Sequence, residues 1–215
     1  LSGVIHDLKT PMSVISGYAQ LLATTDDPEQ RKSFADLVLK QVDHVTAMQK
    51  EVLAFARGER TLLVTKVYVQ KFFEEIRAQI ERELEGRPVT LHLELHDRGT
   101  ARFDEAKMTR ALHNLVRNSL DAMGRQGGRL TLVVERHGDE LVIRVRDTGP
   151  GIPREIQSSL FQYFVTADKA RGTGLGLAIV RKIAEEHGGN VSFVSLSEGV
   201  EFVLRIPQPS GAAPP

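Results

Sequence analysis

The first 22 residues carry apolar side chains at alternating steps of four and three along the chain. The residues of this series are Leu1, Ile5, Leu8, Met12, Ile15, Ala19 and Leu22. The spacing is a heptad seam, which is typical of a helix in a coiled coil or helical bundle. It predicts a first helix over residues 1–24 that buries one narrow face against other helices.

A second helix is predicted over residues 28–57, with Asp27 as its N-cap and Pro28 at its first position. Its residues form two neighbouring seams: Val38, Gln41, Val45, Met48, Val52 and Phe55 in one, and Ala35, Leu39, Val42, Leu53 and Ala56 in the other. A single hairpin partner needs only one such stripe. The second stripe predicts further helices, most simply from a second copy of the chain in a four-helix bundle. The alternative is that it packs on the domain that follows.

A candidate catalytic group lies on the flank of the first helix. His6 follows the seam residue Ile5 and lies about 100° further round the helix. Asp7 is its neighbour, and Thr10 lies one turn along on the same face as His6. Pro11 leaves the Asp7 carbonyl without its helical donor, which predicts a kink. The stretch predicts an exposed imidazole beside a carboxylate and a hydroxyl, although an ordinary solvated helix face has the same pattern.

The composition excludes several classes of protein. Lys and Arg total 28, as do Asp and Glu, so binding to nucleic acid or a membrane surface through bulk charge is not expected. The absence of cysteine excludes disulfides and thiolate chemistry and fits a reducing compartment. No apolar run is long enough to span a membrane, and no signal peptide is visible. Because the chain starts in mid-pattern, we expect a cytoplasmic fragment, with any sensor or membrane segment upstream.

Beyond residue 64, strand and helix patterns alternate. Strands are predicted at residues 64–69, 89–95, 101–103, 130–135, 141–147, 191–196 and 200–206, and helices at residues 72–84, 104–123 and 175–187. The strands cluster as hairpins with helices between them. This order favours an α+β sandwich over a parallel doubly wound sheet.

The helix at residues 104–123 carries a polar stripe opposite its buried face. Asn114, Asn118 and Asp121 follow one another at steps of four and three. Amide and carboxylate oxygens are hard ligands that suit Mg²⁺ when it also holds phosphate oxygens. A solvated helix face would show the same stripe, so this feature alone does not establish a metal site.

Two glycine-rich segments are further candidates for a nucleotide site. Asp147 ends a strand and precedes Gly149 and Gly151, so its carboxylate could accept the exocyclic amine of adenine while the glycines approach the ring. A simple β-turn favours the same residues. Residues 172–177 open a helix with glycines, which makes a cradle for phosphate. They follow the polar loop 165–171 and not a strand, so a dinucleotide-binding turn is excluded.

In their order and spacing these segments resemble the ATP-binding domain of sensor histidine kinases, a fold shared with the ATPase domains of gyrase, Hsp90 and MutL. Residues 114–118 resemble the N box, 147–151 the first glycine box, 161–164 the F box, 172–176 the second glycine box and 6–11 the H box. The resemblance extends from Leu1 to Ile206, and residues 118–123 with the short lid 165–171 resemble the nitrogen-regulation subtype. Phe161 and Phe164 are expected to pack and not to contact the ligand.

The resemblance implies four segments. Residues 1–57 are a dimerisation and histidine phosphotransfer domain, 58–65 a linker, 66–207 a catalytic ATP-binding domain, and 208–215 a disordered tail. The implied fold class is α+β: a helical hairpin that forms a dimeric four-helix bundle, followed by an α/β sandwich of the histidine kinase and Hsp90 type.

The resemblance also implies the chemistry. ATP with Mg²⁺ would be bound by Asn114, Asn118, Asp147, Gly149, Gly151, Lys169, Arg171, Gly172, Thr173, Gly174, Leu175 and Gly176, with the two asparagines as metal ligands. The γ-phosphoryl group would pass to His6, oriented by Asp7, and then to an aspartate in the receiver domain of a response regulator. Thr10 would serve regulator dephosphorylation. Two alternatives are an ATPase or protein kinase of the same fold with another acceptor, and a nucleotide-binding scaffold without turnover.

Overall fold

The computed structural model describes residues 2–56, 62–162, 165 and 174–208, and for residues 2–10, 40, 43–44 and 47–56 it describes the helical backbone only. The described residues divide into two compact units, residues 2–56 and the residues from 62 onward. No described helix has the length and hydropathy needed to cross a membrane.

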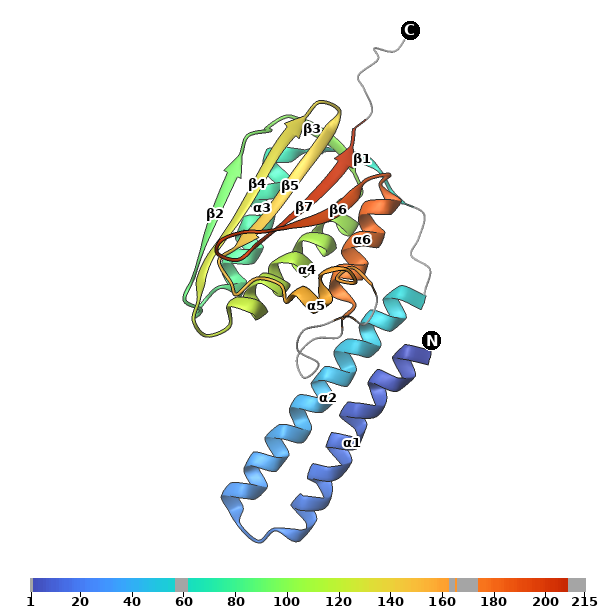
Figure 1. The fold of residues 1–215 in the computed structure, drawn as a ribbon, viewed down its shortest axis with the longest axis vertical. Helices are drawn as coiled ribbons and strands as arrows, with labels where there is room; N and C mark the ends of the chain where they lie inside the picture. The colour runs from blue at the N-terminus through green and yellow to red at the C-terminus, as the bar shows by residue number, and fades with distance from the viewer. Residues whose placement is uncertain (1, 57–61, 163–164, 166–173, 209–215) are drawn as a thin grey trace. The chain divides into compact units, whose positions relative to one another are not determined.

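The first unit is a hairpin of two long helices, α1 (Ser2–Thr24) and α2 (Pro28–Ala56), as the heptad seams predict (Figure 1). Asp27 caps α2, because its Oδ1 accepts the backbone N–H of Glu29 at 2.9 Å. Pro11 is buried inside α1, and the kink that we expect there stays a prediction. The rings of Tyr18 and Phe34 pack between the two helices with centroids 5.7 Å apart.

The second unit is built on a five-stranded sheet in the order β2-β4-β5-β7-β6. These strands are β2 (Val89–Leu95), β4 (Gly128–His137), β5 (Glu140–Asp147), β7 (Val200–Pro207) and β6 (Asn190–Ser195). Three helices form a layer on the sheet, α3 (Val69–Glu83), α4 (Glu105–Met123) and α6 (Gly176–Glu186) (Figure 1). This is the α+β sandwich that the sequence predicts.

The smaller elements complete the unit. Strands β1 (Thr65–Tyr68) and β3 (Thr100–Phe103) pair with each other in a separate two-stranded sheet. A short helix, α5 (Arg154–Gln157), follows the first glycine box and was not predicted. Within the main sheet, β2 pairs with β4 in parallel, while the other neighbours are antiparallel. The sheet is therefore mixed and not doubly wound.

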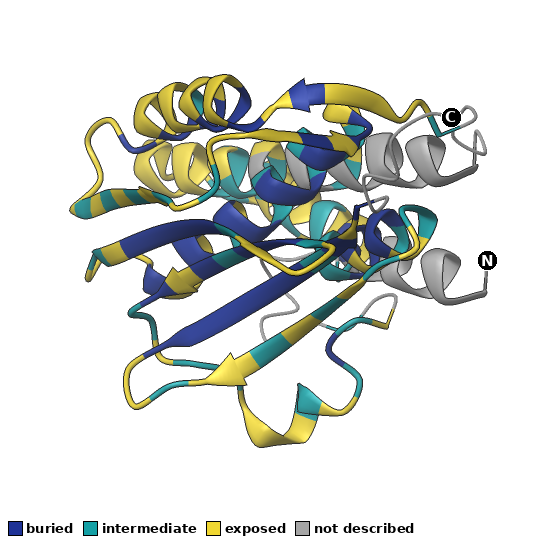
Figure 2. Cartoon of the chain, turned by 90° about the horizontal axis from the view of Figure 1, so that it is seen from above, coloured by how far each residue is buried: buried dark blue, intermediate teal, exposed yellow. Residues whose placement is uncertain are grey.

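The core lies between the helices and the central strands. Rows of cross-strand partners, such as Leu132, Val145 and Phe202, present one apolar face to the helix layer. The central strands are almost continuously buried, whereas β2 and β6 alternate in exposure (Figure 2). Burial of this face positions the strand ends, and the end of β5 is where the candidate site begins.

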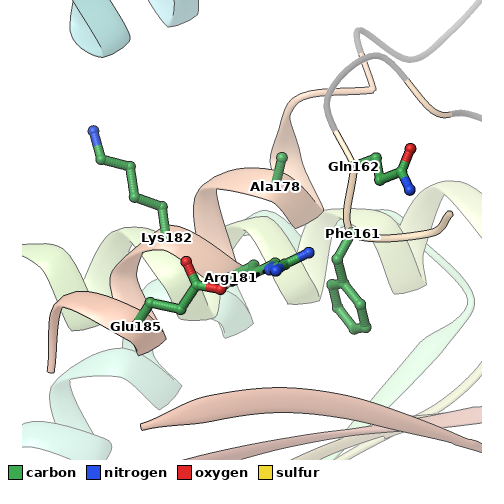
Figure 3. A pocket seen from close by; sticks show the side chains of 6 residues that line it. All are labelled: Phe161, Gln162, Ala178, Arg181, Lys182 and Glu185. Carbon is green, nitrogen blue, oxygen red and sulfur yellow. Dashed lines mark hydrogen bonds and ion pairs between the residues drawn. The ribbon is translucent and has the colours of Figure 1, made fainter. Parts of the chain in front are cut away.

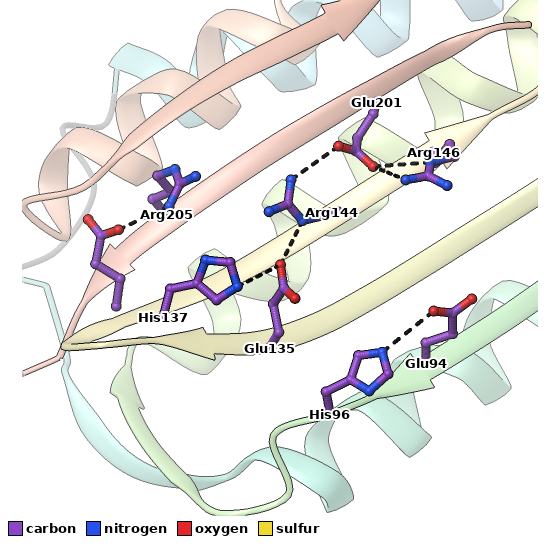
Figure 4. A network of polar contacts seen from close by, with 9 residues as sticks. Glu94, His96, Glu135, His137, Arg144, Arg146, Glu201 and Arg205 are labelled. Carbon is purple, nitrogen blue, oxygen red and sulfur yellow. Dashed lines mark hydrogen bonds and ion pairs between the residues drawn. The ribbon is translucent and has the colours of Figure 1, made fainter. Parts of the chain in front are cut away.

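The opposite face of the sheet carries a network of ion pairs (Figure 4). Arg144 bridges Glu135 and Glu201, with nitrogen–oxygen distances of 2.7 and 3.1 Å, and Arg146 approaches Glu201 at 2.6 Å. The hydrogen bond from Arg144 holds the pKa of Glu135 below its ordinary value. These pairs are shared between β4, β5 and β7, so they stabilise the order of the strands.

Candidate functional site

Helix α4, which carries the polar stripe, is fixed at its N-terminus by Asp104. The Asp104 carboxylate accepts the backbone N–H groups of Lys107 and Leu63, both at 3.0 Å. Burial opposes the charge on Asp104, but these hydrogen bonds and the nearby Lys107 cation outweigh it and hold its pKa below the ordinary value. The Asp104 N–H in turn donates to Nε2 of His187, just beyond α6, at 3.0 Å. This hydrogen bond connects the start of α4 with the end of α6.

The first glycine of α6 lies against the two asparagines of α4. A Cβ added to Gly176 would lie 3.5 Å from Oδ1 of Asn114 and 3.8 Å from both Oδ1 and Nδ2 of Asn118. The fold therefore brings together residues that are 58 positions apart in the sequence (118 and 176). A larger residue at position 176 would fill the space beside both amides.

Asn118 carries an unsatisfied polar group. Its Nδ2 is buried and has no hydrogen-bond partner among the described residues. Buried amides almost always have a partner, and the oxygen and nitrogen of an amide are assigned from their surroundings. An unsatisfied amide at this position suits a phosphate oxygen as it stands, and the flipped amide would present its oxygen to Mg²⁺, which fits the predicted role of Asn118.

The described residues contain no cluster of three or more His, Cys, Asp or Glu side chains that could hold a metal ion. A metal bound at Asn114 and Asn118 would therefore take most of its oxygen ligands from a nucleotide and from water. Mg²⁺ commonly binds in this way, with few protein ligands and several phosphate or water oxygens.

Asp147 ends β5 as a buried carboxylate, with 1% of its surface exposed. Its Oδ2 accepts the hydroxyl of Ser119 at 2.8 Å, and its Oδ1 accepts the backbone N–H of Gly149 at 2.9 Å. Burial raises the pKa of Asp147, and the hydrogen bonds from Gly149, Ser119 and Val200 oppose that rise without cancelling it. A buried acceptor at a strand end is what recognition of an exocyclic amine requires.

The glycines around Asp147 allow the backbone to pack closely. A Cβ added to Gly149 would lie 3.0 Å from Oδ1 of Asp147. Gly151 has a φ of +78°, and Gly199, in the turn between β6 and β7, has a φ of +84°. Both values lie in the left-handed region that favours glycine. A Cβ added to Gly151 would lie 3.6 Å from the Gly199 carbonyl oxygen, so the loop after β5 lies against the β6–β7 turn.

The second glycine box is described only from Gly174 onward. Gly174 has a φ of +66°, and the buried Leu175 is the N-cap residue of α6. A leucine side chain cannot cap the first N–H groups of a helix, so these groups suit an anionic ligand such as phosphate. The remaining predicted residues of the lid and box, Lys169, Arg171, Gly172 and Thr173, lie outside the described residues.

The candidate catalytic residues His6, Asp7 and Thr10 lie in α1, but their side chains are outside the described part of the structure. Their helical backbone agrees with the predicted spacing, and their roles stay predictions. Asp121 is exposed on α4, and its Oδ2 lies 3.9 Å from Nε of Arg117.

Phe161 lines a hollow beside α6. The hollow has a volume of about 460 Å³ and is lined by Phe161, Gln162, Ala178, Arg181, Lys182 and Glu185 (Figure 3). The ring of Phe161 also packs against Phe193 of β6, with centroids 6.3 Å apart. This contact agrees with the expected packing role of Phe161, while Phe164 lies outside the described residues.

Comparison with protein-family models matches both parts of the chain. Residues 1–61 match the model of the His Kinase A (phospho-acceptor) domain. Residues 103–210, half of the chain, match the model of the histidine kinase-, DNA gyrase B- and HSP90-like ATPases. The chain belongs to the histidine kinase family.

Curated relatives agree with this assignment. The chain is 32% identical over 216 residues to the nitrogen regulation protein NtrY of Azorhizobium caulinodans, an alignment that covers 94% of the chain and 27% of NtrY. It is 30% identical to the sensor histidine kinase ZraS of Salmonella typhimurium, over 96% of the chain and 44% of ZraS. The chain therefore spans less than half the length of these two relatives.

Solved histidine kinases have the same fold. The histidine kinase ThkA in complex with the response regulator protein TrrA superposes with a TM-score of 0.80 at 26% identity, over 96% of this chain and 60% of that chain. Full-length ShkA in complex with AMPPNP gives a TM-score of 0.70 at 26% identity, over 99% of this chain and 46% of ShkA.

Sequence reasoning missed two features of this histidine kinase site. Ser119 has the spacing of a buried helix residue, and nothing in the local pattern indicates that its hydroxyl reaches Asp147. The close approach of Gly199 to Asp147 is also absent from the motifs. In both cases the partner is distant in the sequence, by 28 residues for Ser119. The packing of α4 on β5 brings Ser119 to Asp147, and the pairing of β5 with β7 brings Gly199 there.

Proposed function

We propose that this chain is the core of a protein-histidine kinase that autophosphorylates on His6 with ATP and passes the phosphoryl group to an aspartate of a response regulator. The observation that carries the proposal is that one chain matches both the phospho-acceptor model over residues 1–61 and the ATPase model over residues 103–210. Two placements support it: Gly176 lies against Asn114 and Asn118 of α4, and Asp147 is hydrogen-bonded to Ser119 of the same helix.

In the proposed reaction, a neutral ring nitrogen of His6 attacks the γ-phosphorus of ATP, the bond to the β–γ bridging oxygen breaks, and ADP leaves. Asp7 accepts a hydrogen bond from the other ring nitrogen and orients the imidazole. Asn114 and Asn118 would hold Mg²⁺, which offsets the charge of the transferring group when bound. Lys169 and Arg171 are proposed to add positive charge from the lid.

The proposed division of labour follows the two units. Residues 1–57 would form the dimerisation and phosphotransfer domain, residues 58–65 the linker, and residues 66–207 the catalytic domain. The exposed apolar residues of the helical hairpin support a dimer, because Leu39 and Val42 of the second stripe are 61% and 43% exposed in the single chain. A second copy that packs on this stripe would complete a four-helix bundle.

The partner is proposed from its chemistry. The solved ThkA structure holds a response regulator, which supports a receiver domain as the next phosphoryl acceptor for this chain. An ATPase or kinase with another acceptor, or a scaffold without turnover, would lack a phosphohistidine in the H box.

The test is incubation with γ-labelled ATP and Mg²⁺, followed by mapping of the labelled residue. We expect label that is labile in acid and stable in base, and we expect it on His6 alone. His6→Gln should abolish labelling and leave nucleotide binding unchanged. His44→Gln, a histidine of α2 with no assigned role, is the matched control and should label normally. Label that persists on the His6→Gln variant would overturn the proposal.

A further inference from the structure

Ser119 and Asp147 form a buried, hydrogen-bonded pair within the candidate nucleotide site. Each side chain is 1% exposed, and they come from different elements, α4 and β5. The Ser119 hydroxyl donates to Oδ2 of Asp147 over 2.8 Å. Ser119 directly follows Asn118 in α4. One helix therefore carries both the residue that contacts Asp147 and a residue of the proposed phosphate site.

The Asp147 carboxylate accepts hydrogen bonds from Ser119, Gly149 and Val200, and the first two bind different oxygens and fix its rotation. Ser119 holds Oδ2 from the α4 side, and the Gly149 N–H holds Oδ1 from the loop after β5. The two carboxylate oxygens can together accept about four hydrogen bonds, so the three donors leave one acceptor position for the base. Because Ser119 and Gly149 approach from different elements, the carboxylate cannot rotate without losing at least one of them.

We propose that Ser119 is a positioning residue that sets base specificity, because it holds the Asp147 carboxylate with an acceptor oxygen toward the exocyclic amine of adenine. The inference rests on the proposed ATP-binding function. Ser119 contributes no charge of its own and acts on the base through Asp147.

A fixed carboxylate explains both acceptance of adenine and rejection of other purines. An amine at C6 donates to the waiting oxygen. A carbonyl at C6, as in guanine or hypoxanthine, would place two acceptors against each other. A carboxylate that is held by two donors cannot turn away to relieve that repulsion, and a buried polar group without a partner is costly. Without the Ser119 hydroxyl, the carboxylate can rotate more freely. The preference for adenine over guanine or hypoxanthine should then become smaller.

The test is a cycle of four titrations on the full chain with Mg²⁺. Wild type and Ser119→Ala are each titrated with ATP and with purine riboside triphosphate, which has hydrogen in place of the 6-amine. We expect Ser119→Ala to weaken ATP binding by about tenfold, the cost of one hydrogen bond made to a well-placed charged acceptor. The dissociation constants of the analogue for wild type and for Ser119→Ala should differ by no more than about twofold, because the analogue makes no bond to Asp147.

The outcomes separate a positioning role from a structural one. If ATP and the analogue weaken by the same factor, Ser119 only supports the fold of the site, and the inference is overturned. If wild type itself binds the two nucleotides equally, the role proposed for Asp147 fails. If wild type prefers ATP and Ser119→Ala keeps that full preference, the Ser119 inference fails alone.

Two further variants guard the result. Ser119→Cys keeps the size and a weak donor, so its preference for ATP should fall between those of wild type and Ser119→Ala, and it serves as the test protein if the alanine variant does not fold. Ser159→Ala removes a hydroxyl whose hydrogen bond within the described part of the chain goes to the nearby Ile156 carbonyl, at 3.3 Å. The Ser159→Ala variant should keep the wild-type preference for ATP over the analogue. If it loses as much of that preference as Ser119→Ala does, the inference is overturned.

Discussion

The α-carbon of Gly199 packs directly on the carbonyl of Asp147. A Cβ added at Gly199 would lie 1.9 Å from the Asp147 carbonyl oxygen and 2.9 Å from the α-carbon of Thr148. The two residues belong to different hairpins, and β5 and β7 are paired in register at this point, with Asp147 opposite Val200. The backbone that presents the Asp147 carboxylate is therefore positioned by a glycine 52 residues later (199 and 147).

Gly199→Ala should damage both stability and nucleotide binding. An alanine at this position would have to adopt the existing left-handed φ of +84°, and its Cβ would clash with the backbone of Asp147 and Thr148. We therefore expect a loss of roughly 3 kcal/mol or more in unfolding free energy. Gly138→Ala is the matched control, since Gly138 also has a positive φ in a hairpin turn but nothing within 4 Å of an added Cβ. It should cost only about 1 kcal/mol. Urea unfolding and ATP titration of both variants provide the check, and equal losses would contradict the role of the close contact.

ATP affinity should fall in acid through Asp147. Burial raises the pKa of Asp147 above its ordinary value of 3.8, and only the ionised carboxylate accepts the adenine amine on either oxygen. Affinity should therefore decrease as pH falls through the raised pKa. Asp147→Asn should weaken ATP binding by roughly tenfold to a hundredfold at neutral pH and remove this pH dependence. Calorimetric titrations between pH 5 and about 8 test this prediction. It would be contradicted if ATP affinity of the variant fell in acid as it does in wild type.

The same carboxylate should act on stability with the opposite sign. Because its pKa is higher in the folded state, the folded protein binds more protons than the unfolded chain between the two values, and stability falls as pH rises through that window. The penalty is fully present only above the folded-state pKa of Asp147, and the melting temperatures are compared there. Asp147→Asn should thus raise the melting temperature without nucleotide, whereas Asp26→Asn, at an exposed turn, should not.

Asp104 should show the reverse behaviour. Its pKa is lower in the folded protein, so its contribution is fully present above the ordinary value of 3.8 and is lost as pH falls through the lowered value. Asp104→Ala should cost about 1–2 kcal/mol at neutral pH through loss of the cap. Asp104→Asn keeps an acceptor for the cap and should cost less. Denaturant unfolding at neutral pH and in acid tests this prediction. It would be refuted if the difference in unfolding free energy between wild type and Asp104→Ala were the same at both pH values.

The accuracy of the sequence-based prediction differed between local and distant features. The heptad seams and Asp27 placed both helices of the hairpin, since periodicity and capping act within one or two turns. The alternating pattern of residues 89–95 identified β2 but not its parallel pairing with β4, which depends on a crossover connection. No motif indicated that Leu63 donates to Asp104, 41 residues away. Such contacts are decided by tertiary packing and leave no periodic signal.

The candidate site shows the same division. Asn118, Asp147 and Gly176 were chosen for their chemistry and spacing, and the fold places Gly176 beside Asn118. The hydroxyl of Ser119 was not chosen, because a serine among buried helix residues is compatible with simple packing. Its hydrogen bond to Asp147 depends on the packing of α4 against β5.

The exposed stripe of the hairpin predicts a dimer that a single substitution can weaken. In a twofold dimer each substitution is made twice, so loss of the Leu39 side chain should raise the dissociation constant roughly a hundredfold. Leu39→Gln should therefore shift the protein toward monomer while its helix content stays unchanged. Leu63→Gln, at a leucine that is 69% exposed outside the hairpin, is the control. Sedimentation equilibrium distinguishes them, and two variants with equal dissociation constants would refute a dimer interface at Leu39.

Thr10 separates the two activities that α1 could carry. It lies one helical turn after His6 within α1, so a regulator docked with its phospho-aspartate at His6 would meet the Thr10 position on the same face. A hydroxyl there could orient the water that attacks the phosphoryl group. The proposed autophosphorylation would need only His6, its orienting carboxylate and bound ATP. Thr10→Ala should therefore keep most labelling of His6 while regulator dephosphorylation falls by about tenfold or more, the usual scale for loss of one positioning group. Thr10→Ser, which keeps the hydroxyl, should retain dephosphorylation. The two rates are measured on the same preparation, with labelled ATP for the first and phosphorylated regulator for the second, and a Thr10→Ala protein that dephosphorylates the regulator at the wild-type rate would remove Thr10 from this role.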